Sequence, residues 1–367
     1  MKNKYFKTAL CLGVGVITLT AAVFANYDNA NGYSVCKNAA KSILFETNYT
    51  LNTRIEMKVD GESMGKYEAV YKTAGKQDPN KYTSTTESTR KSPSDDFETT
   101  SYEHISQDDY EISINTDGDG VKSSYVYKNY DSDGEVYNSD DGSLIGNRSE
   151  LTGKVINFAE LACDALVGDL KNSIILVDSN NSSNKYNISL SENQMPDLIS
   201  SGASLLMGGI KQGFEDEAKY RAEYPDDYDN SSCTPYLYDT LFNGGDPKVD
   251  SVNGTITVSN SGLPEAANGS VYISGIGSDG KRHMLELSIS FNFSDYGTTT
   301  IEKCDINSLP SPVIHGSNGS ITIIKSSQAT AEQQKDAQNS FDMYSTDGYS
   351  HVYLMDENGK VLDEYEP

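Results

Sequence analysis

The chain has 367 residues, of which 36% are hydrophobic and 23% charged, and its formal net charge is −25 at pH 7. So acidic a surface repels phosphate backbones and anionic lipid headgroups, which argues against nucleic acid as a partner. The length suffices for one large hydrophobic core or for two ordinary ones.

The first 25 residues predict a cleavable secretory signal. Lysines near the N-terminus precede an apolar run from Ala9 to Phe24, and Ala25 is a small residue suited to the cleavage site. The run is shorter than the ~20 residues that span a bilayer comfortably. We therefore expect a secreted, extracellular protein of bacterial type with no integral membrane segment after cleavage, and an uncleaved N-terminal anchor is the alternative. Loss of Lys2, Lys4 and Lys7 makes the net charge −28.

The mature sequence begins with a helix and a series of long hairpins. Apolar residues at helical spacing predict a helix from Tyr33 to Phe45. Strict alternation over 49–59 predicts a strand with one apolar side, and Asp60-Gly61 supplies the turn to a return strand. Residues 81–106 contain few large aliphatic side chains and predict two edge or solvated strands.

A further hairpin precedes two long helices. Alternating residues flank the turn Asp117-Gly118-Asp119-Gly120, and residues 129–148 predict an exposed loop. Broad apolar faces predict helices over 150–170 and 195–218, with a hairpin across 174–190 between them.

The last third of the chain returns to strands. Residues 219–247 predict an acidic, Tyr-rich loop insert, and Asn253-Gly254 predicts a hairpin turn. Two long strands are expected on either side of Asp279-Gly280. Residues 326–340 predict a weak surface helix or linker, and the tail predicts a hairpin across Asn358-Gly359.

These elements predict an α+β fold. One large curved antiparallel β-sheet would form a half-barrel, with about three helices packed on its concave face. The predicted domains are a signal peptide over 1–25, the sheet-and-helix domain over 26–310 with the acidic insert 219–247, and a C-terminal linker with a small hairpin over 311–367.

The order of helix, long hairpins, two helices and more long hairpins, from Tyr33 to Asp305, resembles the LolA-like lipoprotein-carrier group of bacterial envelopes. The resemblance rests on element order and on no short motif. It implies a half-barrel with helices across its mouth and an apolar pocket between them. The chain departs from the group's pattern in its acidic insert, and the residues before Cys11 do not form a lipid-attachment motif.

No pattern in the sequence predicts catalysis. There is no G-x-S-x-G elbow, and the four histidines stand far apart. Residues 115–120 match the first half of a calcium-binding loop, but Val126 occupies the place of the bidentate glutamate, so a hairpin turn is expected there. We expect no enzyme activity, no catalytic residue, no cofactor and no metal site.

Two function classes remain. The first is a non-enzymatic protein that carries or senses a lipid, acyl chain or lipoprotein in an apolar pocket, although the same side chains could simply fill the core. The second is an extracellular interaction protein that displays acidic, Tyr-rich loops to a protein partner and holds no small molecule. The pocket residues predicted for the first class are Ile55, Met57, Phe158, Leu166, Met195, Leu206, Met207, Ile289 and Phe291.

Four cysteines remain after signal cleavage, and export permits disulfides. Cys36 and Cys163 lie on apolar stripes of helices expected on one face of the sheet. Cys233 follows a helix and Cys304 ends a strand. The hypothesis is therefore the pairs Cys36–Cys163 and Cys233–Cys304, and the alternative is four free thiols.

We expect the mature chain to begin at or near Asn26, because the small residue Ala25 ends the apolar run. N-terminal sequencing of the secreted protein measures this directly. Recovery of Met1 in membrane-bound material would show instead that the segment is an anchor.

Overall fold

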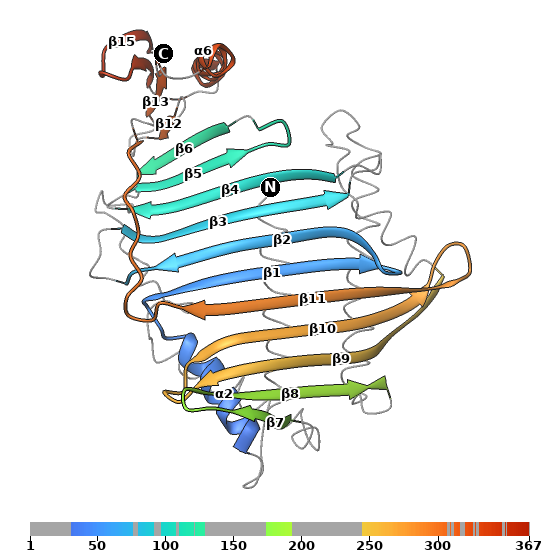
Figure 1. The fold of residues 1–367 in the computed structure, drawn as a ribbon. Helices are drawn as coiled ribbons and strands as arrows, with labels where there is room; N and C mark the ends of the chain where they lie inside the picture. Colours follow the sequence, from blue (N-terminus) through green and yellow to red (C-terminus); the bar gives the residue numbers. More distant parts are fainter. Residues whose placement is uncertain are drawn as a thin grey trace.

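Among the described residues, fifteen strands form one sheet (Figure 1). The computed structural model describes residues 31–75, 80–91, 97–107, 110–120, 122–128, 174–192, 244–306, 309, 312–315, 320–325, 327, 330–346, 349 and 351–366. The strands are β1 (Tyr49–Val59), β2 (Glu62–Thr73), β3 (Asn80–Lys91), β4 (Phe97–Gln107), β5 (Tyr110–Thr116), β6 (Lys122–Lys128), β7 (Ile174–Ser179), β8 (Ser183–Ser191), β9 (Gly245–Ser259), β10 (Pro264–Ile276), β11 (Arg282–Ser294), β12 (Val313–His315), β13 (Ser320–Lys325), β14 (His351–Asp356) and β15 (Val361–Tyr365).

Two antiparallel meanders make up most of this sheet. Strands β1 to β6 pair in succession, as do β7 to β11, and β1 pairs with β11 to join the two sets. The predicted strand over 49–59 is confirmed. So is its turn, because Asp60 and Gly61 have φ angles of 51° and 87°, which a tight hairpin of this hand requires.

The C-terminal strands break the antiparallel pattern. β12 pairs with β6 in parallel, and β13 pairs with β14 in parallel, with helix α6 (Ala331–Thr346) between them in the chain. The prediction of a purely antiparallel sheet is therefore wrong at this end, because α6 makes a crossover between β13 and β14 and because β12 runs in the same direction as β6. The predicted tail hairpin is confirmed as β14 and β15, with Gly359 at φ 79° in the turn.

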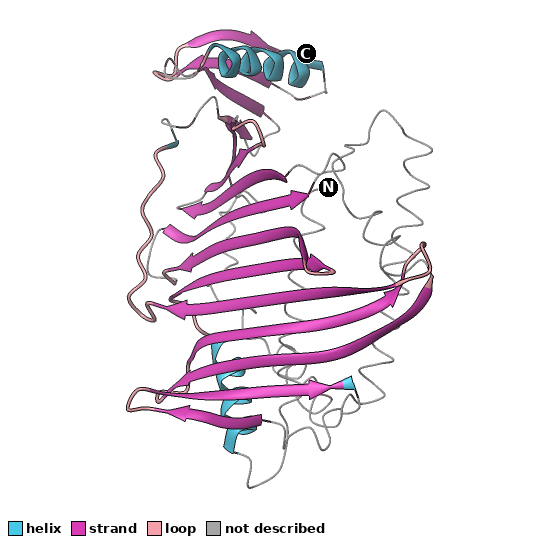
Figure 2. Ribbon diagram, turned by 45° about the vertical axis from the view of Figure 1, so that its right-hand side comes forward, coloured by secondary structure: helices cyan, strands magenta, loops and turns pink. Residues whose placement is uncertain are grey.

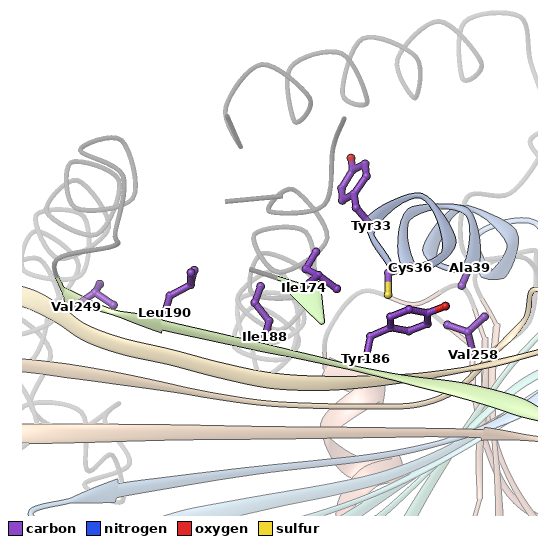
Figure 3. Packing of buried hydrophobic residues seen from close by; sticks show 9 residues of the cluster. All are labelled: Tyr33, Cys36, Ala39, Ile174, Tyr186, Ile188, Leu190, Val249 and Val258. Atoms are coloured by element: carbon purple, nitrogen blue, oxygen red, sulfur yellow. The ribbon is translucent and has the colours of Figure 1, made fainter. Parts of the chain in front are cut away.

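Two helices pack on one side of the sheet, near its opposite ends. Helix α2 (Asn31–Ile43) places Tyr33, Cys36 and Ala39 against β7 to β10 (Figure 3), and α6 covers a cluster on β12 to β14. Paired residues point to the same side, so the register can be followed from β8 to β14. It puts Tyr186 under α2 and Ile323 under α6 on one side, which we call the helix face. Figure 2 shows how the sheet twists between the two helices.

The opposite face has an apolar cluster of its own. Ile105, Ile112 and Val126 of β4 to β6 point there and pack against Cys304, Ile306 and Leu309. The buried Gln107 holds the backbone of Cys304, since its amide donates to the carbonyl of Cys304 at 2.8 Å and accepts from the N–H of Cys304 at 2.7 Å. The prediction that the apolar sides of all strands face the helices is therefore wrong, because β4 to β6 carry apolar side chains on the opposite face.

Other predictions need correction. The described structure is mainly β with two helices, and the helices predicted over 150–170 and 195–218 lie outside the described residues. Of the two alternatives given for residues 81–106, the edge position is wrong, because β3 and β4 lie inside the sheet. Asn253-Gly254 lies within the continuous strand β9, where a Cβ on Gly254 would come within 3.1 Å of Ile188 Cγ2. That glycine serves close packing and not a turn.

We expect Phe291→Asp to destabilise the fold by several kcal/mol, because Phe291 is 8% exposed on the helix face and a carboxylate buried there would have no partner. Asn292→Asp, one residue along on the exposed side of β11, should change stability by no more than about 0.5 kcal/mol. Urea denaturation of both variants measures the difference, and equal shifts would contradict the assigned faces.

Candidate functional site

Four of the predicted pocket residues meet where the two meanders join. Ile55 is paired with Ile289, and the same alternation brings Met57 and Phe291 onto the helix face. Ile289 and Phe291 are 5% and 8% exposed, whereas Ile55 and Met57 are half-buried. Leu287 pairs with Met57 and continues the row, so the junction of β1 and β11 is apolar on this side.

The remaining predicted pocket residues lie outside the described part of the chain, and the pocket as a whole stays a prediction. They are Phe158, Leu166, Met195, Leu206 and Met207.

An aromatic cluster lies at one end of the apolar junction. Tyr49 is fully buried, and its ring lies 5.9 Å from that of Tyr71 and 6.4 Å from those of Phe293 and Tyr296. The Tyr296 hydroxyl donates to the carbonyl of Pro264 at 2.6 Å, and burial raises the pKa of Tyr296. These rings close the end of the apolar row with large side chains.

The opposite face carries a hollow of about 350 Å³ over β1 and β8 to β11. It is lined mainly by asparagine, serine and threonine residues, with Arg54 and Glu56 from β1, and also by Gly254, Gly269 and Ile289. The hydroxyl of Ser290 donates to Asn268 Oδ1 at 2.7 Å. Because Arg54 and Glu56 alternate with Ile55 along β1, the hollow lies on the face opposite the predicted pocket side chains and is not the apolar pocket that the sequence predicts.

Sequence reasoning missed a polar cluster on the helix face of β4 and β5. His104 Nε2 lies 2.8 Å from a Glu111 oxygen, and the Tyr102 hydroxyl lies 3.3 Å from His104 Nδ1 and 3.0 Å from Ser113 Oγ. Pairing of His104 with Ser113 across the hairpin brings these groups together. The hairpin register was the signal that could have found them, because the sequence order alone separates them.

A second histidine ties two hairpin tips together. His283 Nδ1 lies 2.7 Å from Asp60 Oδ2, and His283 Nε2 lies 3.0 Å from Asp279 Oδ1. Asp60 also accepts from the N–H of Met284 at 2.9 Å. The turn after β1 is thereby fastened to the turn before β11.

These contacts shift the pKa values of all three groups. The hydrogen bonds to Asp60 and Asp279 raise the pKa of His283. The Lys281 N–H and then His283 lower the pKa of Asp279 to about 2. Burial by itself would raise the pKa of Asp60, but the hydrogen bonds from His283 and Met284 outweigh it and lower the value.

The cysteine hypothesis is not supported. Cys36 and Cys304 carry free thiols, and Cys163 and Cys233 lie outside the described residues. Cys36 points from α2 toward Tyr186 of the sheet (Figure 3), and burial raises its pKa to about 12. Cys304 lies on the opposite face, where burial also raises its pKa. In these surroundings the two behave as small core residues.

The described residues contain no group of three or more histidine, cysteine, aspartate or glutamate side chains placed to hold a metal ion. Within the same part of the chain, no helix is both long and apolar enough to cross a membrane. The turn at 117–120 is a hairpin turn as predicted, in which the Asp119 N–H donates to Asp117 Oδ1 at 3.0 Å.

No protein-family model and no curated protein matches the chain. One solved structure that is similar in part is a beta-barrel-like protein of domain of unknown function DUF1849 from Brucella abortus, which is 11% identical. The match covers 68% of this chain and 99% of that chain, with a TM-score of 0.17. A likeness at this level carries no argument about fold or function.

We expect the His283 contacts to make stability depend on pH in a defined direction. The raised His283 pKa adds stability that is complete below the ordinary value of 6.5 and is lost as the pH rises through the folded value. The lowered pKa values of Asp60 and Asp279 add stability above 3.8 that is lost as the pH falls toward about 2.

The difference in thermal midpoint between the wild type and His283→Asn should therefore be largest between pH 3.8 and pH 6.5 and smaller at alkaline pH. Asn292→Ser, at an exposed position without a titratable group in the same strand β11, is the control and should show a difference that does not vary with pH. A difference for His283→Asn that stays constant from acid to alkaline pH would contradict the assigned contacts.

Proposed function

We propose that this chain is a secreted, non-enzymatic binding protein that holds a lipid or acyl chain against the helix face of its sheet. The observation that carries the proposal is the apolar row at the junction of β1 and β11, where Ile55 lies opposite Ile289 and Met57 opposite Leu287. A hydrocarbon chain could pack against this row, because burial of apolar area contributes about 25 cal/mol per Å² to the free energy of binding.

The position of the row supports the same proposal. Helix α2 packs against β7, β9 and β10, and α6 packs against β13 and β14, so the junction lies between them in the strand order. In the proposed arrangement the sheet is a half-barrel, further helices cover its concave side, and the ligand lies between helices and sheet. This is the shape that the resemblance to LolA-like carriers implies.

Charge narrows the class of ligand. The chain has 54 acidic and 29 basic residues, so an anionic headgroup would be repelled at its surface. A neutral or zwitterionic lipid, or an acyl chain attached to a protein, fits the proposal better. The alternative of an interaction protein that displays the acidic loop 219–247 rests on residues outside the described part of the chain.

Ile55→Gln tests the apolar row. Exchange of a half-buried apolar side chain for an amide should weaken binding of a fluorescent acyl-chain probe about tenfold, since burying such a side chain contributes about 1.5–3 kcal/mol. The control is Arg54→Gln, the neighbouring residue on the opposite face, whose ion pairs at 3.6 and 3.7 Å are exposed and contribute little. It should bind the probe as the wild type does.

Mass spectrometry of lipids extracted from the natively secreted protein is the second measurement. We expect a stoichiometric lipid in the wild type and less in Ile55→Gln. A wild type that contains no lipid and does not bind the probe would show that the apolar side chains only fill a core.

A further inference from the structure

One edge of the sheet is an exposed apolar strand. β7 is the last strand in the sheet order, and among the described strands it pairs only with β8. Ile175, Leu176 and Val177 are 59%, 51% and 53% exposed. An edge strand offers unpaired backbone groups to another strand, and consecutive exposed apolar residues favour such an addition.

The opposite edge strand of the sheet, β15, carries more charged residues than β7 does. β15 also exposes Val361 and Leu362, but Asp363 and Glu364 follow them directly in the strand. Charges on an edge strand oppose the approach of another strand. β7 has no charge over 174–177, and Asp178 is its only charged residue. Among the described strands, charge thus protects one edge of the sheet and not the other.

We propose that β7 is a self-association edge, at which β7 of a second copy of this chain adds in antiparallel orientation. Such pairing about a twofold axis sets one apolar run beside an identical one. The two Asp178 side chains then lie at opposite ends of the paired region, so like charges do not face each other. This proposal is independent of the lipid-binding function, because it uses the edge of the sheet and not its helix face.

The size and charge of the interface set its expected strength. The register shift between Leu176 and Asp178 limits regular pairing to a few residues, so the buried area falls below the ~1,000 Å² of stable complexes. The dimer should therefore depend on concentration. Each copy has a net charge of at least −25, and this repulsion is screened by salt. Association should strengthen as salt rises, whereas an interface built on ion pairs would weaken.

Sedimentation equilibrium of the full mature chain, at increasing protein concentration and at about 50 and about 500 mM NaCl, tests the proposal. We expect a dimer whose fraction increases with both variables. Ile175→Lys should remove it, and Ile175→Thr, which keeps a β-branched side chain in the strand, should weaken it severalfold.

The matched control is Leu362→Lys on the protected edge β15. It changes the net charge by the same amount as Ile175→Lys, so loss of the dimer in Ile175→Lys alone assigns the interface to β7. Far-UV circular dichroism checks that each variant is folded. A monomeric wild type at high concentration and high salt, or a dimer that survives Ile175→Lys or is lost in Leu362→Lys, would overturn the proposal.

Discussion

The pairing of β1 with β11 is the contact on which the rest of the structure depends. Each meander could form from neighbours in sequence, but only this pairing makes them one sheet. It is fixed at both ends by polar contacts between distant segments. At one end, Asn48 Oδ1 accepts from the N–H of Thr299, 251 residues away. At the other end, His283 lies between Asp60 and Asp279. Closing so long a loop costs entropy, which the shared apolar row and these contacts offset.

The face of the sheet that carries the apolar side chains differs between the junction and β5. On β1 and β11 they point to the helix face, whereas on β5 the apolar Ile112 points to the opposite face, under the segment that contains Cys304. The sheet therefore needs cover on both sides, in different places. The buried amide of Gln107 satisfies both backbone groups of Cys304 and fixes the position of that cover.

Function is proposed for two separate parts of this sheet. The apolar row at the junction suits hydrocarbon, and the β7 edge suits another strand. The two differ in chemistry, because a ligand on the helix face gains from buried apolar area alone, while an added strand also satisfies backbone N–H and C=O groups. The acidic surface acts on both, since it disfavours anionic ligands and keeps copies apart at low salt.

The sequence by itself determined the local elements. Alternation over β1 and β11 and the Asp60-Gly61 turn were predictable because side-chain period and positive φ angles are properties of neighbouring residues. The tertiary structure decided what those elements contact. Asn253-Gly254 reads locally as a turn, yet it continues β9 because strands on both sides pair with it. The sequence makes Cys36 a disulfide candidate, yet it is a buried free thiol between α2 and the sheet. The pairing of β1 with β11, the inner positions of β3 and β4 and the change of apolar face at β5 likewise depend on contacts between residues far apart in the chain, which no local pattern specifies.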